Sequence, residues 1–167
     1  FEPVKSKLIV KSKVVCLGNP IRLSYPTGEK LPIDWSNFTG QTILVLGGSQ
    51  GAKSINEFMQ LNKAYLMKLG YNILHLAGDQ FFNNNQSFIA EKINEKQYLA
   101  LPYLTNMNQA YKVATIVMCR AGATTLAELI HWQLPSILIP YPHAMDDHQT
   151  ENANAFLAIS TASKIVT

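Results

Sequence analysis

Short apolar runs recur along the chain, and most are followed by a turn of small residues and then by a stretch with helical periodicity. The runs lie at residues 14–17, 42–46, 73–77, 98–101, 116–119, 136–139 and 164–166. Several are continuously apolar rather than alternating, which is typical of strands buried on both faces of a parallel sheet. The pattern therefore predicts a set of parallel strands separated by helices.

Helical periodicity predicts helices at residues 54–68, 123–132 and 149–159, with weaker candidates at 83–92 and 106–113. Alternating strands and helices give right-handed crossovers, so we predict an α/β fold with a Rossmann-like, doubly wound parallel sheet. Residues 27–40 lack periodicity and are expected to form a loop. The side chains expected to face inward are Ile55, Phe58, Met59, Leu66, Leu69, Leu126, Leu129, Ile130, Ala153, Phe156 and Leu157.

Composition is consistent with one globular domain, because the chain has 167 residues, of which 47% are hydrophobic and 15% are charged. The net charge is only +3 and no continuous basic tract is present, so no nucleic-acid partner is expected. Lysines alternate near the start, which indicates a solvated edge segment or, as an alternative, a surface attracted to anionic lipid. No apolar run approaches the roughly 18 residues of a membrane span. The chain begins with Phe1, and we interpret it as a piece of a longer protein.

The two cysteines, Cys16 and Cys119, each lie in an apolar run without a metal-ligand partner nearby. We expect free, buried thiols, which suit a reducing cytoplasm, rather than a disulfide or a zinc site.

A glycine-rich turn, GGSQG at residues 47–51, follows the strand at 42–46 and leads into a helix. Small residues let the backbone approach a ligand, and the first N–H groups of a helix point outward. With the helix dipole these groups form a phosphate site, to which the Ser49 hydroxyl adds a donor. The P-loop and dinucleotide-binding glycine patterns do not match this spacing. A purely structural turn is the alternative.

The same turn also matches the nucleophile elbow of serine hydrolases, G-x-S-x-G, with Ser49 as the nucleophile. Asp79 or Asp146, followed by His148, would satisfy the order serine, aspartate, histidine. Only one strand is evident upstream, however, whereas such elbows normally follow several strands and an oxyanion loop. A serine hydrolase is therefore kept as an alternative.

A second strand-to-helix loop contains Ala123, Thr124 and Thr125, whose backbone N–H groups are expected to be available to an anion or a sugar hydroxyl. Glu128 lies one turn further on, where a carboxylate accepts hydrogen bonds from two adjacent hydroxyls, as on a ribose. The pattern Thr125-x-x-Glu128 equally fits a helix capping box, in which Glu128 only satisfies the backbone. Local sequence leaves these two interpretations open.

A polar segment precedes the last predicted helix and holds Asp146, Asp147 and His148. Without a D-x-D spacing or a second cluster, we expect no metal there, and one of the aspartates fits a helix N-cap instead. Gln149 and Asn152 share one helix face and offer both donors and acceptors, which suits the hydroxyls of a hexose.

Together these loops resemble the MurG family of bacterial glycosyltransferases. The matching segments are GNPIR at 18–22, GGSQGAKSIN at 47–56, CRAGATTLAE at 119–128 and HQTENA at 148–153. The resemblance covers nearly the whole chain, although residues 27–40 and 78–97 carry little of it. It implies that residues 1–167 form one UDP-sugar-binding domain, the carboxy-terminal half of a GT-B-type enzyme with two Rossmann-like domains. The acceptor domain is absent from this sequence.

Carried over by position, the resemblance implies donor-binding roles. The glycine turn with Ser49, and Thr124 and Thr125, are expected against the diphosphate, and Glu128 against the ribose. The backbone of Leu104 frames the uracil, Gln149 faces the sugar, and Arg22 lines the cleft near the phosphates. Some members have two glutamines where this chain has His148 and Gln149. The implied residues are Arg22, Gly48, Ser49, Gln50, Gly51, Leu104, Ala123, Thr124, Thr125, Glu128, His148, Gln149 and Asn152.

The activity implied by the resemblance is inverting transfer of N-acetylglucosamine from UDP-N-acetylglucosamine to lipid I, which forms lipid II for peptidoglycan. It implies neither metal nor cofactor, a catalytic base in the missing domain, and a location at the cytoplasmic face of the inner membrane. The chain alone is then expected to be inactive. A non-catalytic UDP-sugar-binding subunit and a serine hydrolase with Ser49 as nucleophile are the alternatives.

Overall fold

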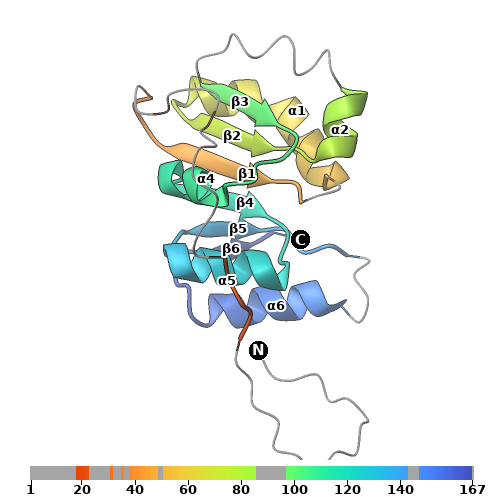
Figure 1. The fold of residues 1–167 in the computed structure, drawn as a ribbon, viewed down its shortest axis with the longest axis vertical. Coiled ribbons are helices and arrows are strands. Elements are labelled where there is room, and N and C mark those ends of the chain that lie inside the picture. Colours follow the sequence, from red (N-terminus) through yellow and green to blue (C-terminus); the bar gives the residue numbers. More distant parts are fainter. Residues whose placement is uncertain are drawn as a thin grey trace, which may run out of the picture.

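The protein is described by a computed structural model that places residues 18–22, 31, 35, 38–48, 51–85, 97–142 and 147–166. Six parallel strands form one sheet with the order β3-β2-β1-β4-β5-β6 (Figure 1). The strands are β1 (Thr42–Leu46), β2 (Asn72–Leu76), β3 (Tyr98–Leu101), β4 (Ile116–Cys119), β5 (Ser136–Leu138) and β6 (Lys164–Ile165). Each corresponds to a predicted apolar run, and the run at 14–17 lies outside the described residues.

The helices that connect these strands are α1 (Lys53–Lys68), α2 (Asp79–Asn84), α4 (Met107–Val113), α5 (Ala123–Trp132) and α6 (His148–Leu157). The predicted helices at 54–68, 106–113, 123–132 and 149–159 are confirmed within two residues at each end. Of the weaker candidate at 83–92, residues 86–92 lie outside the described residues. The described part holds the helix α2, which begins at Asp79 directly after Gly78, whose φ is 85°. Within the described part of the chain, no helix is long and apolar enough to cross a bilayer.

The sheet is covered on both faces, which explains why the strands are apolar at consecutive positions. All five residues of β1 and all five of β2 are buried. Ile55 and Met59 of α1 pack with alternate strand residues on one face. Leu126 of α5 and Phe156 of α6 pack on the other face, together with α4. The doubly wound α/β arrangement predicted from the sequence is therefore confirmed.

Three side chains predicted to face inward are instead exposed: Phe58 by 40%, Leu69 by 56% and Ile130 by 42%. On α1 the buried stripe contains Ile55, Met59 and the polar residue Lys63. At 3.6 residues per turn, Phe58 and Leu69 lie about a quarter turn or more from the centre of that stripe. Hydrophobicity alone did not reveal that polar side chains occupy part of the inward face.

The strand order reverses direction between β1 and β4. From β1 the chain continues outward to β2 and β3, and from β4 it continues outward to β5 and β6. Leu46, the last residue of β1, is in register with Cys119, the last residue of β4. The loops that follow these two strands therefore begin side by side, at the topological switch point where open α/β sheets bind their ligands.

Candidate functional site

The glycine turn after β1 is held by its own backbone and by the end of β2. Ala52 N donates to Gly47 O over 2.6 Å, and Gly51 N donates to Gly48 O over 3.2 Å. Gly48 and Gly51 have φ values of 72° and 79°. A Cβ atom at Gly51 would lie 2.5 Å from the carbonyl oxygen of Ala77, so a larger residue there would displace the backbone. Ser49 and Gln50, both predicted site residues, lie outside the described residues.

The turn leads directly into α1, whose first helical hydrogen bond runs from Asn56 N to Ala52 O over 3.0 Å. The amides of residues 53–55 precede that bond and carry the partial positive charge of the helix start. A cavity of about 230 Å³ adjoins this helix start, and its lining includes Gly51, Lys53 and Asn56 together with polar side chains of α2.

The N-terminus of α5 occupies the corresponding position after β4. Leu126 N donates to Gly122 O over 3.0 Å, so the amides of Ala123, Thr124 and Thr125 precede the first helical bond. Gly122 is the N-cap residue, and Thr125 is already inside the helix. The capping-box interpretation of Thr125 and Glu128 is therefore wrong, because the helix starts earlier than that motif requires.

Glu128 is positioned by a neighbouring helix rather than by the backbone of its own helix. The hydroxyl of Tyr111, a buried residue of α4, donates to Glu128 Oε2 over 2.7 Å. This bond orients the half-buried carboxylate while its other oxygen retains capacity for hydroxyl donors. Leu104, the residue expected near the uracil, is buried in the loop that connects β3 to α4.

Arg120 is a residue of this region that the sequence analysis did not single out. One guanidinium nitrogen donates to the carbonyl oxygens of Ile139 and Pro140, each over 2.9 Å. The other donates to the hydroxyl of Ser54 in α1 over 2.8 Å. Partial burial lowers the pKa of Arg120, and the nearby Tyr141 opposes that shift. Guanidinium remains a cation at neutral pH, so Arg120 places a positive charge at the switch point.

A signal for Arg120 was present in the sequence. It is a cation directly after a buried strand and beside a glycine loop, where its charge needs either partners or a ligand. Its partners are two backbone carbonyls beyond β5 and the Ser54 hydroxyl of α1, which no local pattern reveals.

The two amides predicted to face a sugar brace neighbouring loops. Gln149 Oε1 accepts from the backbone N–H of Tyr141 over 2.9 Å, and Asn152 Nδ2 donates to Ala121 O over 3.1 Å. Each bond uses one end of the amide, so the opposite end retains capacity for a ligand. Exposed His148 begins α6 beside them.

The predicted helix N-cap is Asp147, in a left-handed conformation, and its carboxylate accepts from the Thr150 hydroxyl over 2.7 Å. Among the described residues, no group of three or more His, Cys, Asp or Glu could hold a metal ion. Cys119 is a free, buried thiol, and burial raises its pKa to about 12.

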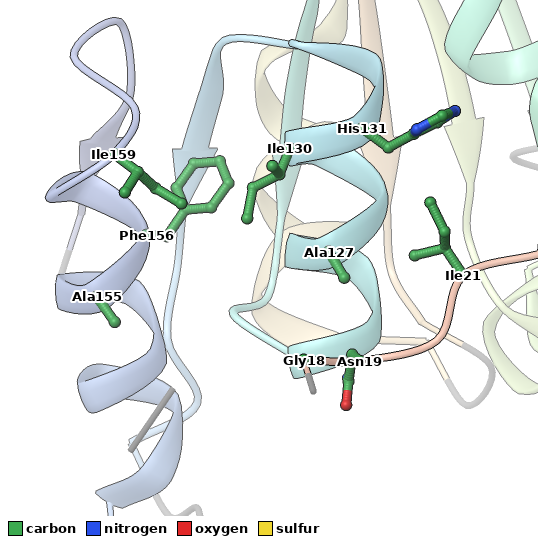
Figure 2. A pocket seen from close by; sticks show the side chains of 9 residues that line it. All are labelled: Gly18, Asn19, Ile21, Ala127, Ile130, His131, Ala155, Phe156 and Ile159. Carbon is green, nitrogen blue, oxygen red and sulfur yellow. The ribbon is translucent and has the colours of Figure 1, made fainter. Parts of the chain in front are cut away.

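A larger cavity of about 510 Å³ lies along α5 and α6. Figure 2 shows Ile130 and Phe156 in the space between the two helices, with Ile21 at the other side of α5. Its lining is mainly apolar and includes none of the residues predicted to bind the donor. Arg22, which is exposed, directly follows Ile21 in the sequence. No residue of the first turn of α1 or α5 lines this cavity, although Figure 2 shows Gly18 and Asn19 beside the N-terminal end of α5.

The architecture defines a Rossmann-like α/β domain with two helix N-termini, a cation and a carboxylate around its topological switch point. The sequence model described as the glycosyltransferase family 28 C-terminal domain matches residues 42–165, and the chain belongs to this family. The predicted resemblance is confirmed. Membership of a glycosyltransferase family disfavours the serine hydrolase.

Three relatives illustrate the similarity. A protein of Nostoc punctiforme named UDP-N-acetylglucosamine--N-acetylmuramyl-(pentapeptide) pyrophosphoryl-undecaprenol N-acetylglucosamine transferase is 35% identical over 161 residues, which cover 95% of this chain and 43% of the relative. The protein of the same name from Halothermothrix orenii is 40% identical over 157 residues, covering 87% and 41%. The crystal structure of Acinetobacter baumannii MurG matches with a TM-score of 0.64 at 35% identity, covering 85% of this chain and 43% of that chain. This chain therefore spans less than half the length of these relatives.

Proposed function

We propose that this chain is the donor-binding domain of an inverting glycosyltransferase that takes N-acetylglucosamine from UDP-N-acetylglucosamine. The observation that carries the proposal is the pairing of two helix N-termini, those of α1 and α5, at the carboxyl ends of adjacent strands. Helix N-termini bind phosphates through free amides and the helix dipole. A UDP-sugar contains a diphosphate, which such a pair of helices is suited to hold.

Charge at the switch point supports the same proposal. When the glycosidic bond of a nucleotide sugar breaks, negative charge develops on the leaving diphosphate. The amides at the start of α1 and α5 stabilise that charge without a metal, together with the guanidinium of Arg120. Arg120 is already oriented by carbonyls and by Ser54, so little reorganisation is needed as the charge develops.

The remaining residues are assigned to the other parts of the donor. Glu128, oriented by Tyr111, accepts from the ribose hydroxyls. The loop around Leu104 contacts the uracil. The N-acetylglucosamine ring lies against the start of α6, where Gln149 and its neighbours offer amide groups. The further assigned residues are Arg22, Gly48, Ser49, Gln50, Gly51, Ala123, Thr124, Thr125, His148 and Asn152.

In the proposed reaction, the 4-hydroxyl oxygen of the muramyl sugar of lipid I attacks the anomeric carbon of N-acetylglucosamine. The bond between that carbon and the diphosphate breaks, UDP leaves with the bonding electrons, and a base takes the hydroxyl proton. The names of the curated relatives support lipid I as acceptor. We assign the base and the acceptor site to a second domain, and the assembled enzyme to the cytoplasmic face of the membrane as a peripheral protein.

Calorimetric titration of this chain with UDP-N-acetylglucosamine and UDP-glucose, with and without EDTA, tests the proposal. Binding that favours the acetylated sugar and ignores the chelator is expected. No binding of either nucleotide sugar, or binding that requires a metal, would contradict it. When lipid I is added to this chain together with UDP-N-acetylglucosamine, no UDP should be released. Turnover by this chain alone would contradict the assignment of the base to another domain.

A further inference from the structure

A network of buried polar side chains connects α1 to the sheet through the interior of the protein. His75, in the middle of β2, is fully buried, and so are Asn56 of α1 and Tyr98 of β3. His75 Nδ1 lies 2.8 Å from Tyr98 Oη, and His75 Nε2 lies 2.9 Å from Asn56 Oδ1. Asn56 Nδ2 donates to the carbonyl oxygen of Ala77 over 2.9 Å. Three elements distant in sequence are thereby connected.

The direction of these hydrogen bonds follows from the fixed acceptor at one end. A carbonyl oxygen only accepts, so the amide nitrogen of Asn56 must face Ala77 and its oxygen must face His75. The proton of a neutral His75 ring therefore resides on Nε2, and the hydroxyl of Tyr98 donates to Nδ1. Burial lowers the pKa of His75 to about 4, so the ring is neutral at physiological pH. The order from Tyr98 through His75 and Asn56 to Ala77 is then the only one in which every bond has a donor.

Ala77 O, the last acceptor of this network, is in contact with Gly51 of the glycine turn. A Cβ atom on Gly51 would lie 2.5 Å from Ala77 O and 3.1 Å from Asn56 Nδ2, so the turn packs directly on both groups. Gly47 N donates to Leu76 O over 2.8 Å beside them. Asn56 also lies in the first turn of α1, where its backbone N–H makes the first helical bond. Any shift of Asn56 or Ala77 would therefore move the turn and the helix start together.

Core packing alone does not require this arrangement. Apolar side chains of similar shape fill an interior as well as a polar network does, without groups that need partners. The polar network adds a directional constraint, because its hydrogen bonds specify how α1 is rotated and how far it lies from the end of β2. Both quantities determine where the amides of the glycine turn and of the first turn of α1 point.

We propose that Asn56, His75 and Tyr98 are positioning residues that set the geometry of Gly51 and of the first turn of α1 for the donor diphosphate, in addition to stabilising the fold. The inference rests on the proposed function, since the turn is assigned to the diphosphate there. It makes a specific distinction between ligands. Loss of the network should weaken binding of a nucleotide that carries phosphates and leave a phosphate-free nucleoside almost unaffected.

Titration of the wild-type chain and of Asn56→Ala with UDP and with uridine tests the inference. For Asn56→Ala we expect affinity for UDP to fall about tenfold or more, with less than a threefold change for uridine. Asn72→Ala is the matched control, because Asn72 is also buried and donates from Nδ2 to a backbone carbonyl, Thr39 O, over 3.0 Å. It lies at the opposite end of β2, so it should lose comparable stability with unchanged affinity for UDP.

Two further variants keep the test informative if Asn56→Ala does not fold. Tyr98→Phe removes a single hydroxyl at the far end of the network and should weaken UDP binding by a smaller factor. His75→Gln retains a side-chain amide that donates toward Asn56, and it should retain more UDP affinity than His75→Leu. Equal affinities of these two His75 variants, or equal losses for UDP and uridine, would overturn the inference.

A ligand-free measurement separates this inference from the proposed function. Amide hydrogen exchange at Gly51, Ala52 and Asn56 should accelerate at least tenfold in Asn56→Ala relative to amides of β4, and it should not in Asn72→Ala. If wild type binds no UDP but exchange accelerates as stated, the proposed function fails, and only the role of the network in holding Gly51 and the start of α1 stands. If wild type binds UDP and neither exchange nor UDP affinity changes in Asn56→Ala, the positioning role fails.

Discussion

Arg120 donates a hydrogen bond of 2.8 Å to the hydroxyl of Ser54, and this contact joins the two halves of the sheet across the switch point. Arg120 follows β4, and Ser54 lies in the first turn of α1, which follows β1. The same guanidinium also binds two carbonyls beyond β5. One side chain therefore determines how the loops of three strands are placed relative to one another.

Replacement of Arg120 by lysine should weaken UDP binding about tenfold, because a single ammonium group cannot reach both carbonyls and Ser54 at once. Ser54→Ala removes only the hydrogen bond between Arg120 and Ser54 and should weaken UDP binding about threefold or less. Calorimetric titration measures both. If Arg120→Lys binds UDP as tightly as wild type, Arg120 does not contribute to this site.

Glu128 should determine recognition of the ribose. Wild type is expected to prefer UDP over 2′-deoxy-UDP by about tenfold, because the carboxylate accepts from the 2′-hydroxyl. Glu128→Ala should bind both nucleotides with the same, lower affinity. Tyr111→Phe removes the hydroxyl that orients Glu128 and should reduce the preference without abolishing it. A preference that persists in Glu128→Ala would show that another group reads the ribose.

The stability of the protein should decrease in mild acid because of His75. Burial lowers the pKa of this residue from 6.5 to about 4, so the unfolded chain binds a proton between these values that the folded chain does not. The contribution of His75 is fully present above pH 6.5 and is lost as the pH falls toward 4. Its loss amounts to about 2 kcal/mol of unfolding free energy between pH 7.5 and pH 5.

Urea unfolding of wild type and His75→Gln at pH 7.5 and pH 5 measures this contribution. The variant lacks the titrating imidazole. Between pH 7.5 and pH 5 its unfolding free energy should therefore fall by about 2 kcal/mol less than that of wild type. Among the described residues, the other titratable groups near His75 are Tyr98 and Lys63, whose Nζ is 5.2 Å from the centre of the Tyr98 ring. Both are retained in wild type and variant, so they cancel in the comparison. Equal losses of stability in the two proteins would contradict the prediction.

The two glycines of the turn should differ in their tolerance of alanine. Both have positive φ, but a Cβ atom at Gly48 meets nothing within 4 Å, whereas one at Gly51 approaches Ala77 O. Gly48→Ala should lower the unfolding free energy by about 1 kcal/mol from backbone strain alone, and Gly51→Ala should lower it by about 2 kcal/mol or more. Urea denaturation of both variants gives the comparison. Equal costs would show that the turn relaxes freely away from β2.

Much of the fold was predictable because its signals are local. Short, mainly apolar runs predicted all six described strands, and helical periodicity predicted the start of α5 at Ala123. Polar residues on inward faces were not predictable in this way. Asn56 and His75 occupy buried positions because they bind each other, and a pattern that counts apolar residues cannot detect such a pair.

The candidate site was predictable where it depends on a loop after a strand, and less so where it depends on tertiary contacts. The helix starts at α1 and α5 follow from small residues at the ends of strands. The partner of Glu128 is Tyr111, which is 17 residues away on another helix. The partners of Arg120 lie beyond a different strand. Side-chain pairing over such distances leaves no periodic trace in the sequence.

We propose that the donor diphosphate lies between the N-termini of α1 and α5, and backbone amide NMR shifts during titration with UDP-N-acetylglucosamine test this placement. The largest shifts are expected at residues 51–55 and 122–125, with smaller shifts at Glu128 and Gln149. Asn72, at the opposite end of the sheet, should not shift. Saturable shifts concentrated in the apolar cavity around Ile130 and Phe156, with none at the two helix starts, would contradict this placement of the diphosphate.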